Sequence, residues 1–386
     1  MERVYLDYAA TTPVDDRVSE IISQYNNDIF GNPSSLHSFG TEAKDVVTNS
    51  RAIIANYIGA KPEEVCFTSG GTESNNFAIK GIAYSRKNQG NHIIVSSIEH
   101  DCILNSCKWL ESQGFEITLL PVDSKGTLDR EILMDAIRQN TILVSVMSAN
   151  NEIGTLEPID DIGRICQEKG VLFHCDACQS FGKLPLNVEK SNIDLLTINS
   201  HKIYGPKGVG ALYIRKGVTI TPLLHGGGQE SGLRSTTENI PGIAGFAKAA
   251  EICHTEMESE FSRLTALRKK LSDFLIHNFD GAYINGDELN RLPCHLSFCL
   301  GGLEGETIRL LFLLDEMGFA VSAGSACSSN HSNGSSHVLR AIGLDQFQAR
   351  GGIRVTFGRF TTEADLLLFM DSLKIATKKL NNIFSN

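Results

Sequence analysis

The stretch EVCFTSGGTESNNFAIKGIAYSRK (residues 64–87) joins a short β-rich run to a longer helix-like run through two consecutive glycines. We predict a strand over Glu64–Thr68, a turn over Ser69–Ser74 and a helix over Asn75–Lys87. A strand that passes through a tight turn into a helix is the building unit of α/β proteins. The question is then whether this unit recurs along the chain.

The same alternation continues to about residue 214. Predicted strands lie at Glu64–Thr68, His92–Ser97, Glu116–Pro121, Ile142–Ser148, Val171–Cys175, Leu195–Ile198 and Gly210–Ile214. Helix-like stretches between them cover Asn75–Lys87, Asp129–Gln139 and Asp160–Lys169. Because such alternation is typical of parallel strands joined by crossover helices, we predict an α/β fold with a large, mostly parallel sheet covered on both faces.

From about Ala247 the pattern changes to long helices with few strands. We predict a long helix over Ala247–Phe279, and further helices and strands at Glu306–Met317, Ser336–Ile342, Glu363–Leu380, His295–Leu300, Ala320–Ser322 and Ile353–Phe357. These elements indicate a smaller α+β domain, joined by the N-terminal segment. The predicted division is a large domain over residues 15–255 and a small domain formed by residues 1–14 and 256–386.

The composition is that of an ordinary globular protein. The chain has 386 residues, with 41% hydrophobic and 21% charged residues. Its formal net charge of -10 gives no reason to expect strong nucleic-acid binding or an anionic membrane partner. Ten cysteines without a disulfide spacing, and no recognisable export signal, lead us to expect reduced thiols and a cytoplasmic location.

The segment SGGTES (Ser69–Ser74) could hold an anion. Glycines let the backbone approach a phosphate, and the first turn of a helix presents free N–H groups to it. The segment is not a Walker loop, because no Gly-Lys-Ser/Thr follows, and GVGALY does not complete a G-x-G-x-x-G motif. Taken alone, a glycine turn before a capped helix is an equally good interpretation.

Polar clusters follow several of the predicted strands, where α/β sheets bind their ligands. Asp176 ends one strand, and a carboxylate buried there requires a cationic partner. Lys202 follows another strand in NSHKIYGPKGVG, where a partly dry environment would suit Schiff-base chemistry. An anion site, an acid and a lysine at one sheet edge are the functions that pyridoxal phosphate needs.

Two cysteine-containing segments have alternative interpretations. The C-x-x-C of HCDACQ (residues 174–179) could suggest zinc or redox chemistry, but no second ligand pair recurs and Cys175 ends a strand, so we expect buried thiols and no metal site. SAGSACSSNHSNGSSH (Ser322–His337) has one cysteine, Cys327, and no large apolar side chain. We expect it to be a mobile loop.

Six motifs together resemble the cysteine desulfurases, which are pyridoxal-phosphate enzymes of the class V aminotransferase superfamily. They are NSHKIYGPKGVGALY, DACQSFGKLP, SANNEIGT, GNPSSLHSFG, HGGGQESGLRS and SAGSACSS. The likeness runs from YLDYAATTP to IRVTFGRFTTEAD, and the serine-rich loop is similar to that of the long-loop group. The resemblance implies the pyridoxal-phosphate transferase fold, with a large cofactor-binding domain and a small domain that carries the catalytic cysteine.

The resemblance also implies roles for individual residues. Lys202 would hold the cofactor as a Schiff base, Asp176 and Gln179 would contact its ring nitrogen and hydroxyl, and His100 would stack on the ring and could activate the thiol. The phosphate would be bound by Gly71, Thr72, Ser200, His201 and, from the second subunit of a homodimer, Thr237. Asn151 and Arg354 would hold the substrate carboxylate, and Cys327 would be the nucleophile. Cys178 departs from the family pattern as an extra thiol.

The implied reaction converts L-cysteine to L-alanine and transfers the sulfur to Cys327 as a persulfide. An acceptor protein would then take the sulfur, for iron–sulfur cluster assembly or for thio-modification of nucleic acid. The alternatives are a selenocysteine lyase, a related class V lyase or aminotransferase, and a non-catalytic sulfur relay on the same fold.

Overall fold

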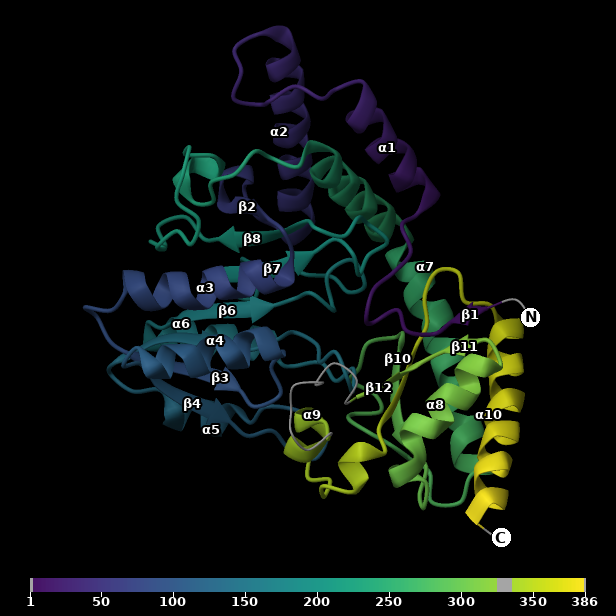
Figure 1. Ribbon diagram of the computed structural model, residues 1–386. Coiled ribbons are helices and arrows are strands. Elements are labelled where there is room, and N and C mark those ends of the chain that lie inside the picture. Colours follow the sequence, from purple (N-terminus) through teal and green to yellow (C-terminus); the bar gives the residue numbers. More distant parts are fainter. Residues whose placement is uncertain (1–2, 325–334, 385–386) are drawn as a thin grey trace.

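The computed structural model describes residues 3–324 and 335–384. Its largest feature is a seven-stranded sheet in the order β2-β8-β7-β6-β5-β3-β4 (Figure 1). The strands are β2 (Val65–Thr68), β3 (His92–Ser96), β4 (Glu116–Leu120), β5 (Thr141–Ser145), β6 (Leu172–Asp176), β7 (Leu195–Asn199) and β8 (Gly210–Ile214). Only β8 runs antiparallel to its neighbours in this sheet, so the mostly parallel sheet is confirmed.

Helices cover both faces of the large sheet because its strands are apolar on both sides. Leu195 packs in one hydrophobic cluster and its neighbour Leu196 in another, as expected when successive side chains point to opposite faces. One cluster includes residues of α3 (Gly71–Ser85) and α4 (Asp101–Ser112). The other includes residues of α2 (Ser38–Ile58), α6 (Ile159–Lys169) and α7 (Ile240–Asn278), while α5 (Arg130–Ala136) lies near the β4 edge.

A second, antiparallel sheet has the order β12-β13-β10-β9. Its strands are β9 (Tyr283–Ile284), β10 (His295–Cys299), β12 (Ser322–Ala323) and β13 (Ile353–Thr356), and α8 (Thr307–Glu316), α9 (His337–Ala341) and α10 (Glu363–Phe384) accompany it. The single strand predicted at Ala320–Ser322 is wrong. The chain forms two short strands there, since β11 (Phe319–Ala320) pairs in parallel with β1 (Val4–Tyr5) while β12 pairs with β13.

Helix α7 connects the two sheets. It begins seven residues before the predicted start at Ala247, where the Asn239 side chain accepts a hydrogen bond from the N–H of Gly242 and Pro241 occupies the first turn. Its first half packs against the large sheet and its second half, from Leu264, packs against the small one. The predicted division between residues 255 and 256 falls inside this continuous helix and stays a prediction.

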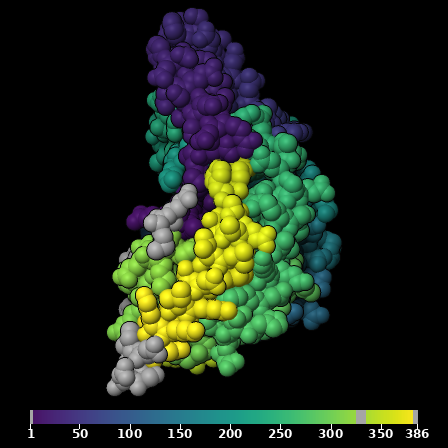
Figure 2. Space-filling view, turned by 90° about the vertical axis from the view of Figure 1, so that its right-hand side faces the viewer, coloured from purple at the N-terminus to yellow at the C-terminus, as the bar shows by residue number. Residues whose placement is uncertain are grey.

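Helices α1 (Asp16–Asn27) and α2 pack on the first part of α7 and project at one end of the molecule (Figures 1 and 2). Helix α10 runs along the surface at the other end (Figure 2). Within the described ranges, no helix is both long enough and apolar enough to cross a membrane.

Candidate active site

A cleft of about 700 Å³ opens beside the carboxyl ends of β2, β3, β6 and β7. Its lining brings together most of the predicted site residues with several that were not predicted: Ala9, Ala10, Gly71, Thr72, Asn75, His100, Cys102, Asn151, Asp176, Cys178, Gln179, Asn199, His201, Lys202 and Arg354. This is the position at which an α/β sheet binds its ligand, because the ends of neighbouring strands meet there.

Helix α3 starts at the cleft directly after β2. Gly70 has φ 146°, a value that favours glycine, and the helix begins at Gly71 with no side-chain cap. A Cβ atom at Gly71 would lie 2.7 Å from Cys178 Sγ, so the turn has no room for a side chain there. The uncapped first turn leaves backbone N–H groups available to an anion.

Asp176 is the last residue of β6 and is buried. Its Oδ2 accepts a hydrogen bond from Asn75 Nδ2 at 2.7 Å, and its Oδ1 accepts one from the backbone N–H of Cys178 at 2.8 Å. The cation expected from the sequence is not among the described side chains, since no ion pair there involves Asp176. Two N–H donors compensate for burial instead, and the carboxylate stays available to a cationic ligand.

His100 caps the N-terminus of α4. Its Nδ1 accepts a hydrogen bond from the backbone N–H of Cys102 at 3.2 Å and lies 3.1 Å from Cys102 Sγ. Burial lowers the pKa of the imidazole, and the neighbouring positive charge of Lys202 lowers it further. His100 therefore meets the cleft as a neutral ring.

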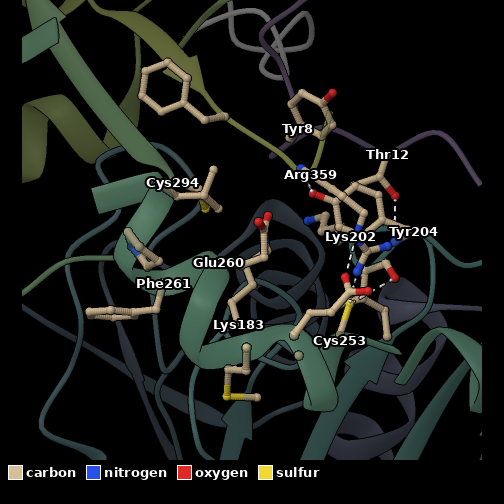
Figure 3. A pocket seen from close by; sticks show the side chains of 17 residues that line it. Tyr8, Thr12, Lys183, Lys202, Tyr204, Cys253, Glu260, Phe261, Cys294 and Arg359 are labelled. Carbon is tan, nitrogen blue, oxygen red and sulfur yellow. Dashed lines mark hydrogen bonds and ion pairs between the residues drawn. The ribbon is translucent and has the colours of Figure 1, made fainter. Parts of the chain in front are cut away.

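Lys202 follows β7 and lines two cavities. Besides the cleft, it borders a second, narrow cavity, together with Lys183, Glu260 and Arg359 (Figure 3). No hydrogen bond or ion pair joins its Nζ to any residue that the structure describes. An amine at a strand end without a partner is free to react, as Schiff-base chemistry requires.

Gln179 is held from two sides. Its Nε2 donates to the carbonyl oxygen of Ala9 at 3.1 Å, and its Oε1 accepts from Lys183 Nζ at 3.4 Å. Burial lowers the pKa of the Lys183 amine. His201 also lines the cleft, and burial lowers the pKa of its ring to about 4, so it is a neutral hydrogen-bonding group there.

Arg354 lies on β13 of the small sheet and reaches the cleft. Its Nη2 forms an ion pair with Asp7 Oδ1 at 2.8 Å, and its Nη1 donates to the carbonyl oxygen of Asn151 at 2.9 Å. Its Nε is buried without a hydrogen-bond partner in the described chain. The guanidinium is thus oriented by Asp7 and Asn151, and these two contacts use only two of its five N–H donors.

Comparison with known proteins agrees with this geometry. The family model described as Aminotransferase class-V matches residues 4–369. The cysteine desulfurase IscS of Dictyoglomus turgidum is 50% identical over 380 residues, which are 98% of this chain and 96% of that protein. The chain is a cysteine desulfurase of the class-V aminotransferase family.

Two solved structures are also similar to this cysteine desulfurase. A NifS-like protein superposes with a TM-score of 0.91 at 39% identity, covering 97% of this chain and 99% of that one. The structure titled SspA in complex with cysteine gives a TM-score of 0.81 at 39% identity, covering 93% and 99%. The predicted family, fold, enzyme class and pyridoxal-phosphate dependence are confirmed.

The cleft of the desulfurase fits pyridoxal phosphate. The Gly71 turn is too close to Cys178 for any side chain and presents helix N–H groups to a phosphate. Among the described residues, neither Lys202 Nζ nor the buried Oδ1 of Asn199 has a partner, and Asp176 is available to a cation. Each functional part of the cofactor thus has a chemically suitable group in one cleft.

Three predicted site residues of the desulfurase are not brought into the cleft. Ser200 lies between the lining residues Asn199 and His201 in the sequence but is itself fully buried, and its Oγ has no partner within the described chain. Thr237 is exposed and lies outside the lining. Cys327 lies outside the described residues.

Among the site residues that sequence reasoning missed, three contact predicted ones through their side chains. Asn75 lies one helical turn after Thr72, and Cys102 lies two residues after His100, so spacing from known candidates could have found both. Asp7 is 347 residues from Arg354, and no local pattern connects the two.

Proposed function

We propose that this cysteine desulfurase transfers the sulfur of L-cysteine to Cys327, leaving L-alanine, and passes the resulting persulfide to a protein acceptor. The carbon–sulfur bond of the substrate breaks, a sulfur–sulfur bond forms on Cys327, and the thiol proton balances the new C–H bond of alanine. The observation that carries the proposal is the Lys202 amine, which has no partner among the described residues, in a cleft that also contains Asp176 and Arg354.

Each side chain of the cleft would have a separate role in the reaction. Lys202 Nζ bonds the cofactor and then carries the α-proton of the substrate, because no described group competes for it. Asp176 holds a proton on the ring nitrogen, and Gln179, fixed by Ala9 and Lys183, meets the ring hydroxyl. Bound pyridoxal phosphate supplies an electron-accepting ring that makes the α-proton easier to remove.

The remaining contacts would set phosphate and substrate binding. In this proposal the phosphate is bound by Gly71, Thr72 and His201 of the cleft lining and by Thr237 of a second subunit. Ser200 would join them only if its buried Oγ, which has no partner in the described chain, becomes accessible to the phosphate. The substrate carboxylate meets Arg354 and Asn151. Because Asp7 already orients one edge of the guanidinium, Arg354 approaches its ligand in a fixed direction.

We also propose a homodimer. Thr237 is exposed rather than in its own chain's cleft, as a residue that serves a neighbouring subunit would be. The segment before and into α2 exposes Phe30, Leu36 and Phe39, and Leu36 is fully exposed. Exposed large apolar side chains gathered on a projecting segment are typical of an interface.

The acceptor and the location complete the proposal. A protein acceptor for iron–sulfur assembly is supported by similarity to a desulfurase named IscS, and thio-modification of nucleic acid remains the second destination. A cytoplasmic location is supported by the cysteines of the described chain, all of which are free.

Cys327→Ser and Cys178→Ser form the matched test. Cys327→Ser should bind cofactor normally and nearly abolish alanine release from L-cysteine, since a hydroxyl is a far weaker nucleophile toward sulfur. Cys178→Ser should retain most alanine release. Full activity in Cys327→Ser, with loss in Cys178→Ser, would assign the nucleophile to Cys178. If the parent protein and both variants released selenium from L-selenocysteine but did not cleave L-cysteine, the selenocysteine lyase would be favoured.

A further inference from the structure

A chain of hydrogen bonds joins Asp176 to His100 through two residues with no assigned role. Asn75 Nδ2 donates to Asp176 Oδ2 at 2.7 Å and to Cys102 Sγ at 3.2 Å. Cys102 Sγ lies 3.1 Å from His100 Nδ1. The chain therefore connects the buried carboxylate of Asp176 to the imidazole of His100, and both residues line the cleft.

The direction of each bond in this chain follows from its neighbours. An Asn75 oxygen turned toward Asp176 would place two acceptors 2.7 Å apart, so the amide nitrogen faces the carboxylate. The same nitrogen donates to Cys102 Sγ, which leaves the thiol proton free to point to His100 Nδ1. The backbone N–H of Cys102 also donates to Nδ1 at 3.2 Å, and a backbone N–H cannot accept.

We propose that Asn75 and Cys102 are positioning residues that hold the His100 imidazole as the tautomer with its proton on Nε2. The thiol and the backbone N–H of Cys102 both donate to Nδ1, so Nδ1 carries the lone pair. In a neutral ring, Nε2 then carries the hydrogen. No described group hydrogen-bonds Nε2, and the ring lines the cleft.

The charges around the ring act together with this chain. Lys202 and His337 disfavour a protonated imidazole, whereas Asp176 and Asp101 favour it, and burial disfavours it most. Protonation at Nδ1 would also turn that atom into a donor facing the N–H of Cys102. The ring is therefore held neutral as well as in one tautomer.

This tautomer limits what His100 can do. It offers the cleft an N–H donor, which can stabilise a thiolate, rather than a lone pair that could take a proton from a thiol. This consequence rests on the proposed function, but the tautomer does not, so the two can fail separately. His100 is then not the base that activates Cys327.

The test measures the tautomer directly in the full-length protein labelled with ¹⁵N-histidine, with and without cofactor. Two-dimensional ¹H–¹⁵N spectra distinguish a protonated Nε2 from a protonated Nδ1, and a His100→Gln variant identifies the signal. We expect protonated Nε2 in both forms at neutral pH. A hydrogen on Nδ1 in the parent protein overturns the proposal without any variant of Cys102 or Asn75.

Variants then test the positioning residues. Cys102→Ala removes the thiol donor and should raise the population of the other tautomer about two- to tenfold, with a higher pKa for His100. Cys102→Ser keeps a donor and should restore the parent tautomer, and Asn75→Ala should act like Cys102→Ala. Cys107→Ala, on the same helix and in the hydrophobic cluster, is the control and should change neither quantity. An unchanged tautomer and pKa of His100 in Cys102→Ala would show that the backbone N–H of Cys102 alone determines the tautomer.

Discussion

Individual side chains of the cleft differ chiefly in whether they have a partner. Asp176 and Arg354 are each held by two described hydrogen-bonding groups, which fixes their direction toward a ligand. Lys202 lines the same cleft with no such partner. The oriented groups suit binding, and the unpaired amine suits reaction.

Lys202→Ala should therefore remove both turnover and the visible absorbance of protein-bound cofactor, because no other described lysine lines the cleft. Lys207→Ala is the matched control, since Lys207 follows in the same loop but is exposed. Absorbance spectra and alanine release measure the two effects. Cofactor that remains covalently bound and reducible by borohydride in Lys202→Ala would show that another lysine is the reactive one.

Glu157 predicts how stability depends on pH. Burial raises the pKa of this carboxyl group to about 8, although its Oε2 accepts a hydrogen bond from the Leu128 N–H. In the unfolded chain the group titrates near about 4.3. Between these two pKa values, Glu157 is protonated in the folded protein and ionised in the unfolded chain. The protonated carboxyl group therefore contributes stability at low pH, and this contribution is lost as the pH rises to about 8.

Glu157→Gln removes that titration while retaining an oxygen for the Leu128 N–H. The fall in melting temperature between pH 6 and pH 9 should be smaller in the variant by roughly 2–5 °C. Glu168→Gln, at an exposed position on α6, should leave the fall unchanged. Equal pH dependence in the parent and Glu157→Gln would contradict a raised pKa.

Secondary-structure elements were predictable to the extent that their side chains form a local pattern. All seven strands of the large sheet appear within three residues of their predicted ends, because short apolar runs bounded by turn residues are typical of strands. Helices α1, α2 and α4 were missed, although the buried positions of α2 and α4 have helical spacing. The two-residue strands β1, β9, β11 and β12 are set by pairing across the fold and have no pattern of their own.

The start of α3 and the turn after β6 pack closely at Gly71 and Cys178. A methyl group at Gly71 would lie 2.7 Å from Cys178 Sγ, so Gly71→Ala should cost about 1–3 kcal/mol in free energy of unfolding and weaken cofactor binding. Cys178→Ala removes the sulfur, and the double variant should recover most of both losses. Denaturant unfolding and cofactor titration complete the double-mutant cycle. Purely additive effects would show that the contact is not what excludes a side chain at Gly71.

At the scale of the whole molecule, the site depends on segments that are distant in sequence. The ion pair between Asp7 and Arg354 brings the N-terminal segment to β13, and α7 is continuous between the two sheets. The local sequence pattern predicted which residues could bind the cofactor or react, but it did not predict these long-range contacts. In the proposed homodimer, Thr237 would extend the same point to a second chain, because it is exposed and does not line the cleft of its own chain.

Subunit mixing tests that placement. Thr237→Ala should bind pyridoxal phosphate more weakly, roughly tenfold, if a phosphate contact is lost, and Lys202→Ala should be inactive. In a mixed dimer, the Thr237→Ala subunit retains Lys202 and receives an intact Thr237 from its partner, so one site is complete. At limiting cofactor, co-refolded or co-expressed mixtures should therefore be more active than the Thr237→Ala protein alone at the same concentration of intact Lys202. The control mixes Thr237→Ala with a Lys202→Ala/Thr237→Ala double variant, which should give no gain. If the first mixture also gives none, Thr237 acts in its own chain or does not contact the phosphate.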